Sequence, residues 1–397
     1  MFEHLQIYAA RERWLVGCAD ALLTPYGWLT RRRGPRGRVG SLPRRMLLLR
    51  LERIGDLLMT LGALEIARAG APDAEIHLVV GSWNESLARL IPGIDSLETL
   101  DAPWLSRHGS GVTAATALRR ARSWRARRFD LAINFEPDIR SNLLLALGGA
   151  PRRFGYASGG GGALLTDALA FDPDLHTAEN AARLMAAALG PDEMATAGPD
   201  RRRPPPRLRV PDDVRRRASE MLAGAASRRP LIGLHASGGR PVKQWHLDRF
   251  AQVAARLARE HDATIVLTGA TEDRPLVDHV KAGLPSGVRT VDACGSLELP
   301  VLAGLLEQLT LFITGDTGPM HLAAAVGTPV VALFGPSGPR RYGPLTSEAT
   351  IVTTDLWCRP CNRVRRPPER CVGRVPDCLD RIDVDRVCVA ANELLRG

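Results

Sequence analysis

Four residues that follow one predicted strand are suited to binding an anion: Asp316, Thr317, Gly318 and His321. They stand in the stretch FITGDTGPMHLAA, where an apolar strand is expected over 311–314 and a helix over 319–326. Asp and Thr are good helix N-caps, and proline is favoured at the first helical position. A helix start offers unpaired N–H groups and the positive end of a dipole, which together bind phosphate. The same residues would also fit a capped helix that holds no ligand.

A small Gly-rich loop follows the strand expected over 231–235 and contains Ser237 and Lys243. Lys243 is one of two lysines among the 53 basic residues of the chain. A lysine is a compact positive charge that suits a pyrophosphate. The loop therefore predicts a phosphate contact, although a solvated loop lysine would have the same pattern.

Acidic residues follow two other predicted strands. Glu272 or Asp273 comes after the strand expected over 263–268, and an acid at such a position often holds ribose hydroxyls in nucleotide-binding domains. Asp273 fits equally well as a helix cap.

Asp56 comes after the strand expected over 46–50, where a carboxylate can act as general base toward an acceptor hydroxyl. A helix-capping aspartate is the competing interpretation of Asp56.

Alternating strand and helix patterns must position these residues. Short apolar runs separated by helical stretches are typical of βαβ units and doubly wound parallel sheets. Strands are expected over 46–50, 75–80, 130–135, 231–235, 263–268, 288–292, 311–314 and 330–334. Helices are expected over 56–69, 141–147, 246–261, 273–282, 299–308, 319–326 and 383–395. Because ligands bind at the carboxyl ends of such strands, we expect an active site in a cleft between two α/β domains.

The Arg/Pro-rich stretch over 195–210 interrupts this pattern and is the candidate domain boundary, because three consecutive prolines cannot join a sheet interior. A second unusual stretch lies over 1–30, which is rich in aromatic and aliphatic residues and is followed by five arginines over 31–38. It fits either a helix packed on the body of the protein or an amphipathic helix in a membrane interface.

Composition narrows the class of protein. The 397 residues carry a formal net charge of +10, and residues 1–45 and 200–229 each contribute a net +6. A nucleic-acid-binding protein usually carries its basic face on the folded body, so this distribution argues against a nucleic-acid partner. No apolar run is long enough to span a membrane.

Four of the seven cysteines cluster near the C-terminus: Cys358, Cys361, Cys371 and Cys378. The cluster opens with a C-x₂-C pair and could hold a structural zinc or an iron–sulfur cluster. Disulfides and free thiols are the open alternatives. The overall cysteine usage favours a reduced, cytosolic compartment.

Taken in this order, the segments resemble glycosyltransferase family 9, the lipopolysaccharide heptosyltransferase family. The resemblance covers about residues 45–395 and rests on Arg53-Ile54-Gly55-Asp56, on Lys243 with Trp245, on the run Asp316–Ala325, on Gly327-Thr328-Pro329 and on Phe334-Gly335-Pro336. The middle stretch over 138–155 is also similar to the first domain of the family.

The resemblance implies an α/β GT-B fold, with two Rossmann-like, doubly wound domains facing across a cleft. The implied organisation begins with an N-terminal helical, amphipathic and basic leader over 1–44 and an acceptor-side domain over 45–195. An Arg/Pro-rich linker with a linker helix over 196–229 leads to a nucleotide-sugar-binding domain over 230–357. The Cys cluster and a C-terminal helix occupy 358–397.

The resemblance also implies an inverting, metal-independent enzyme that needs no cofactor for catalysis and uses a nucleotide-diphospho-sugar donor, typically ADP-heptose. Asp56 matches the catalytic base of the family, Lys243 a donor-phosphate ligand and Glu272 the ribose acid. The other implied donor contacts are Ser237, Asp316, Thr317, Gly318 and His321. Ala236-Ser237 stands where the family often has paired threonines, and this departure bears on the identity of the sugar.

The implied acceptor is a lipopolysaccharide core or a related lipid-linked glycan. Arg140 and His176 are candidate acceptor-binding residues, since arginine pairs well with phosphate and carboxylate. The expected location is cytoplasmic, with the leader bringing the enzyme to the inner face of the inner membrane. Two alternatives stay open: an epimerase-like nucleotide-sugar enzyme on the same fold, and a non-catalytic nucleotide-sugar-binding protein.

Overall fold

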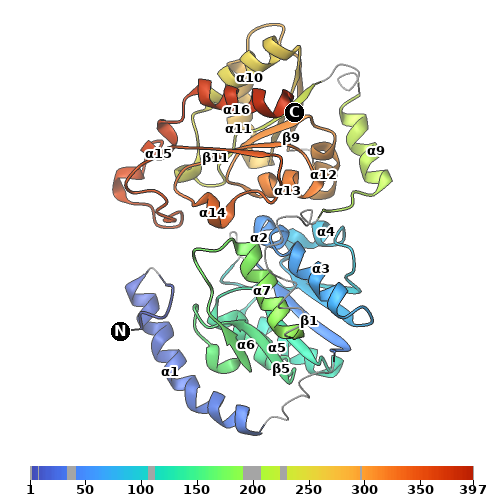
Figure 1. Ribbon diagram of the computed structural model, residues 1–397, viewed down its shortest axis with the longest axis vertical. Coiled ribbons are helices and arrows are strands. Elements are labelled where there is room, and N and C mark those ends of the chain that lie inside the picture. The colour runs from blue at the N-terminus through green and yellow to red at the C-terminus, as the bar shows by residue number, and fades with distance from the viewer. Residues whose placement is uncertain are drawn as a thin grey trace. The chain divides into compact units, whose positions relative to one another are not determined.

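The computed structural model describes residues 2–7, 9–33, 42–105, 112–190, 207–223, 230–295 and 297–396. The chain divides into two compact units, Met1–Arg203 and Pro204–Gly397 (Figure 1). Each unit holds one parallel six-stranded sheet with helices packed on it, which confirms the predicted α/β class. Residues 1, 8 and 34–41 of the predicted leader, and residues 196–206 and 224–229 of the predicted linker, lie outside the described residues.

The sheet of the first unit has the strand order β3-β2-β1-β4-β5-β6, the order of a Rossmann domain. Its strands are β1 (Arg45–Arg50), β2 (Glu75–Val80), β3 (Ser96–Thr99), β4 (Leu131–Asn134), β5 (Arg152–Tyr156) and β6 (Asp167–Leu169). The middle of the central strand β1, residues 46–49, is apolar because both faces of the sheet are covered, and an arginine stands at each end of the strand. Leu48 pairs in register with Leu78 on one side and Ile133 on the other, and all three are buried.

The helices of the first unit pack on both faces of this sheet. They are α1 (Ala10–Arg33), α2 (Ile54–Leu58), α3 (Leu61–Gly70), α4 (Glu85–Ala88), α5 (Ala114–Ser123), α6 (Ile139–Leu147) and α7 (Thr177–Leu189), with 3₁₀ turns η1 (Ser82–Asn84), η2 (Trp124–Arg127) and η3 (Gly162–Leu164). Helices α5 and α6 share one core with Leu47 and Leu49 of β1. Met46 and Leu48, whose side chains point to the opposite face, are equally buried.

The N-terminal helix α1 packs on η3 of the first unit. Asp20 accepts a hydrogen bond from the Gly161 N–H at 2.9 Å. At Gly27 the backbones come so close that a Cβ would lie 2.5 Å from the Ala163 carbonyl oxygen. One side of the leader helix is therefore docked on the body, as the first of its two interpretations expected.

The second unit repeats the Rossmann strand order, as β12-β11-β10-β7-β8-β9. Its strands are β7 (Leu231–His235), β8 (Thr264–Gly269), β9 (Thr290–Cys294), β10 (Leu311–Gly315), β11 (Val330–Phe334) and β12 (Ala349–Thr353). Its helices are α9 (Asp212–Met221), α10 (Leu247–His261), α11 (Arg274–Ala282), α12 (Leu299–Glu307), α13 (Gly318–Val326), α14 (Pro339–Tyr342), α15 (Asp377–Asp380) and α16 (Val384–Arg396), with 3₁₀ turns η4 (Pro241–Lys243), η5 (Thr271–Asp273) and η6 (Glu369–Cys371).

The linker helix and the C-terminal helix both belong to this second unit. Helix α9 packs on α12, where Arg215 forms an ion pair with Glu307 at 2.8 Å. Helix α16 lies against α10 and β12. The buried Trp245 indole donates a hydrogen bond to the Ile382 carbonyl at 3.1 Å and so ties the segment before α16 to the start of α10.

The helix predicted over 56–69 is two helices, α2 and α3, rather than one. The break falls at Met59 and Thr60. The Thr60 hydroxyl donates to the Asp56 carbonyl at 2.8 Å, and the Thr60 N–H bonds to the Leu57 carbonyl in a tighter turn. Such local side-chain bonds compete with the regular helical ladder, so the chain redirects after the first turn.

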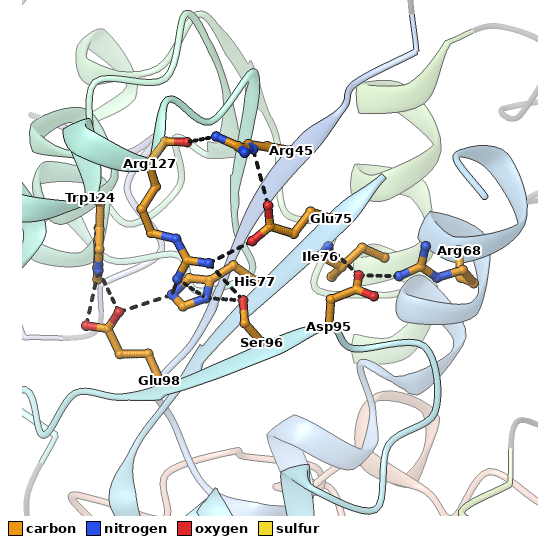
Figure 2. A network of polar contacts seen from close by, with 10 residues as sticks. All are labelled: Arg45, Arg68, Glu75, Ile76, His77, Asp95, Ser96, Glu98, Trp124 and Arg127. Carbon is orange, nitrogen blue, oxygen red and sulfur yellow. Dashed lines mark hydrogen bonds and ion pairs between the residues drawn. The ribbon is translucent and has the colours of Figure 1, made fainter. Parts of the chain in front are cut away.

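A polar network ties three strands of the first sheet together at their amino ends (Figure 2). The buried His77 ring lies 2.7 Å from the Ser96 hydroxyl and 3.1 Å from the Glu98 carboxylate, and Arg127 bonds to the same ring. Because Rossmann domains bind ligands at the carboxyl ends of their strands, we assign this network a structural role.

Candidate active site

Each sheet has one point at which the strand order reverses, between β1 and β4 in the first unit and between β7 and β10 in the second. Ligands of open α/β sheets bind outside the carboxyl ends of the strands at such a point. The segments that leave those strand ends hold Asp56 in the first unit, and Ser237, Lys243, Asp316 and Thr317 in the second. The candidate residues thus lie where the topology of each unit favours binding.

In the second unit, the turn between β10 and α13 forms a helix start with little side-chain capping. Thr317 is the N-cap residue and has an extended backbone, but its side chain makes no capping hydrogen bond. Its hydroxyl lies 3.1 Å from the Thr314 hydroxyl instead. The first-turn N–H groups of α13 are therefore not taken up by the N-cap side chain, and such groups are suited to an anion.

Lys243 reaches this turn from the loop after β7. Its ammonium group lies 3.1 Å from the Asp316 carboxylate and also donates to the Asp316 backbone carbonyl. The side chains are 18% and 12% exposed, so the pair is shielded but still accessible. The two segments singled out in the sequence are thus in contact. The ion pair itself was not anticipated, and it means that a phosphate at Lys243 would share the ammonium group with Asp316.

The loop after β7 is folded tightly enough to fix Lys243. A Cβ on Gly238 would lie 2.5 Å from the Lys243 backbone carbon, so only glycine fits there. The Gly238 N–H donates to the Gln244 side chain at 2.8 Å, and the Gly239 N–H donates to the Ser237 hydroxyl at 3.2 Å. The Ser237 oxygen is the acceptor in this bond, so the bond does not use the Ser237 O–H as a donor.

The remaining candidates of the second unit differ in exposure. His321 lies on the first turn of α13 and is buried. Glu272 lies on η5, just after β8, and is exposed. Asp273 accepts a hydrogen bond from the Ala270 N–H at 2.9 Å and so caps the start of η5. It is also the N-cap residue of α11, but its side chain makes no capping bond there. The ribose role of Glu272 stays a prediction.

His235 is a buried titratable residue of this region that the sequence interpretation missed. It ends β7, and its Nδ1 lies 3.2 Å from the Thr268 hydroxyl. Burial lowers the pKa of His235 below its ordinary value, so the ring is neutral near pH 7. In the sequence, the feature that could have pointed to His235 is its position as the one titratable residue at the end of the apolar run LIGLH.

In the first unit, Asp56 lies in the first turn of α2. Its carboxylate accepts a hydrogen bond from the Arg53 N–H at 3.1 Å and lies 3.7 Å from the Arg50 guanidinium. The side chain is 26% exposed. Asp56 therefore has the capping role that its position suggested, and it also keeps a carboxylate surface that solvent or a ligand can reach.

Two buried charged residues lie next to Asp56 and were also missed. Arg50 ends β1, and its guanidinium donates to the Asp56 carbonyl at 3.0 Å and to Glu52 at 2.9 Å. Glu136 follows β4 and accepts hydrogen bonds from the Leu51 N–H and, at 2.6 Å, from the Ser141 hydroxyl. Burial raises the pKa of Glu136 to about 7, despite those hydrogen bonds and the nearby Arg50. In the sequence, the feature that could have pointed to Arg50 and Glu136 is a charged residue at the end of each of the apolar runs MLLLR and LAINFE.

The two candidate acceptor residues have local structural partners. Arg140 lies at the start of α6, pairs with Asp138 through two oxygens and stacks over the Trp104 ring at 5.3 Å. His176 is the N-cap of α7, where its Nδ1 accepts a hydrogen bond from the Ala178 N–H at 3.1 Å. Their predicted acceptor roles stay predictions.

The four clustered cysteines are all thiols in the structure, so the disulfide alternative is wrong here. Burial raises the pKa of the Cys378 thiol to about 11, and the neighbouring Cys361 and Cys371 add to the shift. Within the described ranges, no group of three or more His, Cys, Asp or Glu residues is placed to hold a metal ion. As positioned here, the four thiols do not fit a metal centre, and we derive no chemistry from one.

Comparison with known proteins identifies the family. The model of glycosyltransferase family 9 (heptosyltransferase) matches residues 117–371, and Asp56 lies outside that range. Lipopolysaccharide heptosyltransferase 2 of Salmonella typhimurium is 28% identical over 307 residues, which cover 75% of this chain and 85% of that protein.

Two further similarities agree with this result. Lipooligosaccharide heptosyltransferase 2 of Haemophilus influenzae is 35% identical over 128 residues, but these span only 31% of this chain and 36% of that protein. The crystal structure of a family 9 glycosyl transferase from Veillonella parvula matches with a TM-score of 0.75 and 25% identity, over 89% of this chain and 97% of that chain. The expected GT-B-like fold is thereby confirmed. The chain belongs to glycosyltransferase family 9, the heptosyltransferase family, and is a glycosyltransferase.

Proposed function

We propose that the enzyme transfers a heptosyl residue from a nucleoside-diphosphate donor, ADP-heptose, to a lipopolysaccharide core acceptor with inversion of the anomeric centre. The observation that carries this proposal is the contact of Lys243 with Asp316 at the start of α13. It combines a cation and a helix N-terminus at the strand-order reversal of the second unit, which is an arrangement suited to a diphosphate. Family membership and the names of the matched relatives support the heptosyl and lipopolysaccharide parts of the proposal.

The second unit would bind the donor. The diphosphate would accept hydrogen bonds from the first-turn N–H groups of α13 at Gly318, with Thr317 and His321 beside it. Lys243 would balance part of the phosphate charge, and Ser237 would add a hydroxyl. Glu272 would accept hydrogen bonds from the ribose. Because negative charge grows on the diphosphate as the glycosidic bond breaks, donors fixed in advance at this position lower the barrier without a metal ion.

The first unit would supply the base. In the proposed reaction, the acceptor hydroxyl attacks the anomeric carbon from the face opposite the diphosphate. Its proton passes to the Asp56 carboxylate, the bond from the anomeric carbon to the phosphate oxygen breaks, and the nucleoside diphosphate leaves with its electron pair. Asp56 suits this role because its Oδ2 accepts a hydrogen bond from the Arg53 N–H and its Oδ1 lies 3.7 Å from the Arg50 guanidinium, while the side chain remains 26% exposed. Arg140, at the start of α6, and His176 are the proposed contacts for the anionic acceptor.

We also propose that α1 brings the enzyme to an anionic membrane surface. Trp14, Leu15 and Leu22 are 55%, 54% and 81% exposed. They are spaced so that they share one side of the helix, away from the docked residues Asp20 and Gly27. The helix runs on into Arg31–Arg33, and residues 1–45 carry a net charge of +6. Within the described part of the chain, no helix has the length and apolar content to cross a bilayer.

A panel of nucleotide sugars tests the donor assignment. Each compound is added to the purified full chain, the unfolding free energy is measured, and the products are analysed with and without an acceptor. ADP-heptose at about 100 times its Kd is expected to add roughly 2.7 kcal/mol and to yield acceptor-linked heptose. Stabilisation with no transfer would identify a binding protein, and a donor epimerised without an acceptor would contradict the proposed reaction.

A further inference from the structure

The segment between β12 and α15, residues 354–376, carries a group of exposed arginines and is called the Arg-rich segment below. It holds six arginines against Asp355 and Glu369, a net charge of +4. Arg359 is partly buried, and the other five arginines are exposed: Arg363, Arg365, Arg366, Arg370 and Arg374. The positive charge of the segment therefore faces solvent.

Most of these exposed arginines are not neutralised by an acidic side chain. Elsewhere in the second unit, Arg215 and Arg274 each form ion pairs with two carboxylates. Within the segment, Arg374 pairs with Asp377 at the start of α15. Among the residues that the structure describes, the other four exposed arginines form no ion pair with a carboxylate: Arg363, Arg365, Arg366 and Arg370. Guanidinium groups in this state keep their planar fork of donors available for phosphate oxygens.

An exposed tryptophan accompanies the arginines. Trp357 is 87% exposed, and the Arg370 guanidinium lies over its ring, 4.9 Å from the centroid. Val372 of the same segment is 61% exposed. Tryptophan and arginine are enriched among the residues that contribute most to binding surfaces. The face of an aromatic ring carries partial negative charge, which suits the polarised C–H groups of a sugar ring.

Hydrogen bonds anchor the Arg-rich segment at the carboxyl edge of the second sheet. The Arg359 Nε donates to the Gly335 carbonyl at 2.9 Å, and the Asn362 N–H donates to the Pro336 carbonyl at 2.9 Å. Gly335 and Pro336 begin the turn that leaves β11, and β11 pairs with β10. The segment is therefore fixed one strand away from the turn of Asp316, which belongs to the proposed donor site.

We propose that the Arg-rich segment is a binding surface for a phosphorylated oligosaccharide. This inference rests on the proposed function and adds a property of its acceptor, namely phosphate groups that the second unit recognises. The unpaired arginines bind phosphate oxygens through their planar forks, and Trp357 packs against a sugar ring. A sugar chain is favoured over a lipid bilayer or a nucleic acid because the segment is anchored beside the turn of Asp316, where a glycosyl group is transferred in the proposed reaction.

The test measures the Kd of a phosphorylated core oligosaccharide, freed of lipid, for the full chain without donor. R363Q/R365Q/R366Q is expected to raise this Kd by about 10- to 100-fold, because charge-assisted hydrogen bonds to phosphate are lost. After removal of its phosphate groups, the oligosaccharide is expected to bind the unmodified chain as weakly as the variant. The variant is expected to bind the two forms equally, and its Kd for a donor analogue should not change.

R209Q/R216Q/R259Q is the matched control. It removes the same charge from three exposed arginines that belong to other parts of the second unit, so it separates a defined surface from an effect of net charge. It is expected to bind both forms of the oligosaccharide as the unmodified chain does.

Variants of Trp357 test the sugar contact by itself. W357A is expected to raise the Kd of both forms of the oligosaccharide by about 10-fold. W357F keeps an aromatic face and is expected to restore most of the affinity. Equal affinities of W357A and the unmodified chain would contradict the role of Trp357.

The outcomes separate this inference from the proposed function, because the binding measurements need no turnover. A Kd that R363Q/R365Q/R366Q raises no more than the control does overturns the surface, even if transfer to a core acceptor is normal. Loss of binding to phosphatidylglycerol vesicles or to a single-stranded oligonucleotide, with oligosaccharide binding kept, would also overturn it. Phosphate-dependent binding that needs the arginines, in an enzyme that transfers nothing to a core acceptor, would contradict only the proposed reaction.

Discussion

Lys243 and Asp316 are 73 residues apart in the chain, and their side chains form an ion pair of 3.1 Å at the start of α13. The loop after β7 and the turn after β10 meet because the two strands are neighbours in the sheet, with Leu234 paired to Ile313. Strand order thus places a cation beside a helix N-terminus, although 73 residues separate the two segments. This contact is the structural basis of the proposed diphosphate site.

Lys243→Ala is expected to weaken donor binding more than it lowers kcat. A charge-assisted hydrogen bond contributes roughly 1.5–3 kcal/mol, so the Kd of a donor analogue should rise by about 10- to 100-fold. Calorimetry measures this directly. A double-mutant cycle with Asp316→Ala separates the phosphate contact from the ion pair. If the two variants change only the thermal stability and leave the donor Kd unaltered, the pair is purely structural and Lys243 is not a phosphate ligand.

Gly238→Ala and Gly239→Ala form a matched pair that tests the shape of the β7 loop. A Cβ at Gly238 would lie 2.5 Å from the Lys243 backbone, so the alanine variant must displace Lys243 and should bind the donor poorly. A Cβ at Gly239 meets nothing within 4 Å, and only its φ of +65° is unfavourable to alanine. Gly239→Ala should therefore cost about 1 kcal/mol of stability and leave the donor Kd nearly unchanged. Equal donor affinities for the two variants would contradict a site built on Lys243.

The lowered pKa of Glu98 predicts how the stability of the first unit depends on pH. Burial alone would raise the pKa of Glu98, but hydrogen bonds from His77, Arg120 and Trp124 outweigh it and lower the pKa to about 2, from an ordinary 4.5. Figure 2 shows the contacts of Glu98 with His77 and Trp124. A carboxyl group with a lowered pKa stabilises the folded state above its ordinary pKa. This contribution is lost as the pH falls from about 4.5 to 2.

Urea unfolding of the unmodified enzyme and of Glu98→Gln checks this expectation. The variant should be less stable at pH 7, and the difference should shrink toward pH 3. Glu85→Gln is the control, because Glu85 forms an exposed ion pair with Arg89 on one helix turn and should change little at either pH. A difference for Glu98→Gln that is constant with pH would contradict the ionised Glu98 network.

Replacing Trp14, Leu15 and Leu22 by serine tests the membrane proposal. The unmodified chain is expected to float with phosphatidylglycerol vesicles and to be released by salt, because basic residues contribute through electrostatic attraction to anionic lipid. The triple variant is expected to remain unbound. Val389→Ser removes an equally exposed apolar residue from α16 of the second unit and should float normally. Equal partitioning of the triple variant and the unmodified chain would exclude α1 as the attachment site.

The central strands were predictable from sequence, whereas the edge strands β3, β6 and β12 were not predicted. The edge strand β9 overlaps the strand expected over 288–292. The strands expected over 75–80, 231–235 and 330–334 coincide with β2, β7 and β11, because a strand buried on both faces is a continuous apolar run. The strands β3 and β6, with the sequences SLET and DAL, lie at or near sheet edges and are only half-buried or exposed. They carry no apolar run, and their pairing depends on neighbours distant in the chain.

The site was predictable only as far as the strand ends. The pattern of an apolar run followed by Gly, Asp, Thr or Lys located Asp56, Lys243 and Asp316, since parallel strands bring their carboxyl ends to one edge. The ion pair of Lys243 could not be read from the pattern, because it depends on a side-chain conformation. Arg50 and Glu136 were missed because their interaction arises only once β1 and β4 are paired.

The most direct test of the proposed mechanism is the turnover of Asp56→Ala with ADP-heptose and a lipopolysaccharide core acceptor, measured together with the donor Kd. Loss of a general base typically lowers the rate by about 10²–10⁴-fold, so we predict a fall of that size with donor affinity retained. Turnover close to that of the unmodified enzyme would contradict the assignment of Asp56 as the base that activates the acceptor.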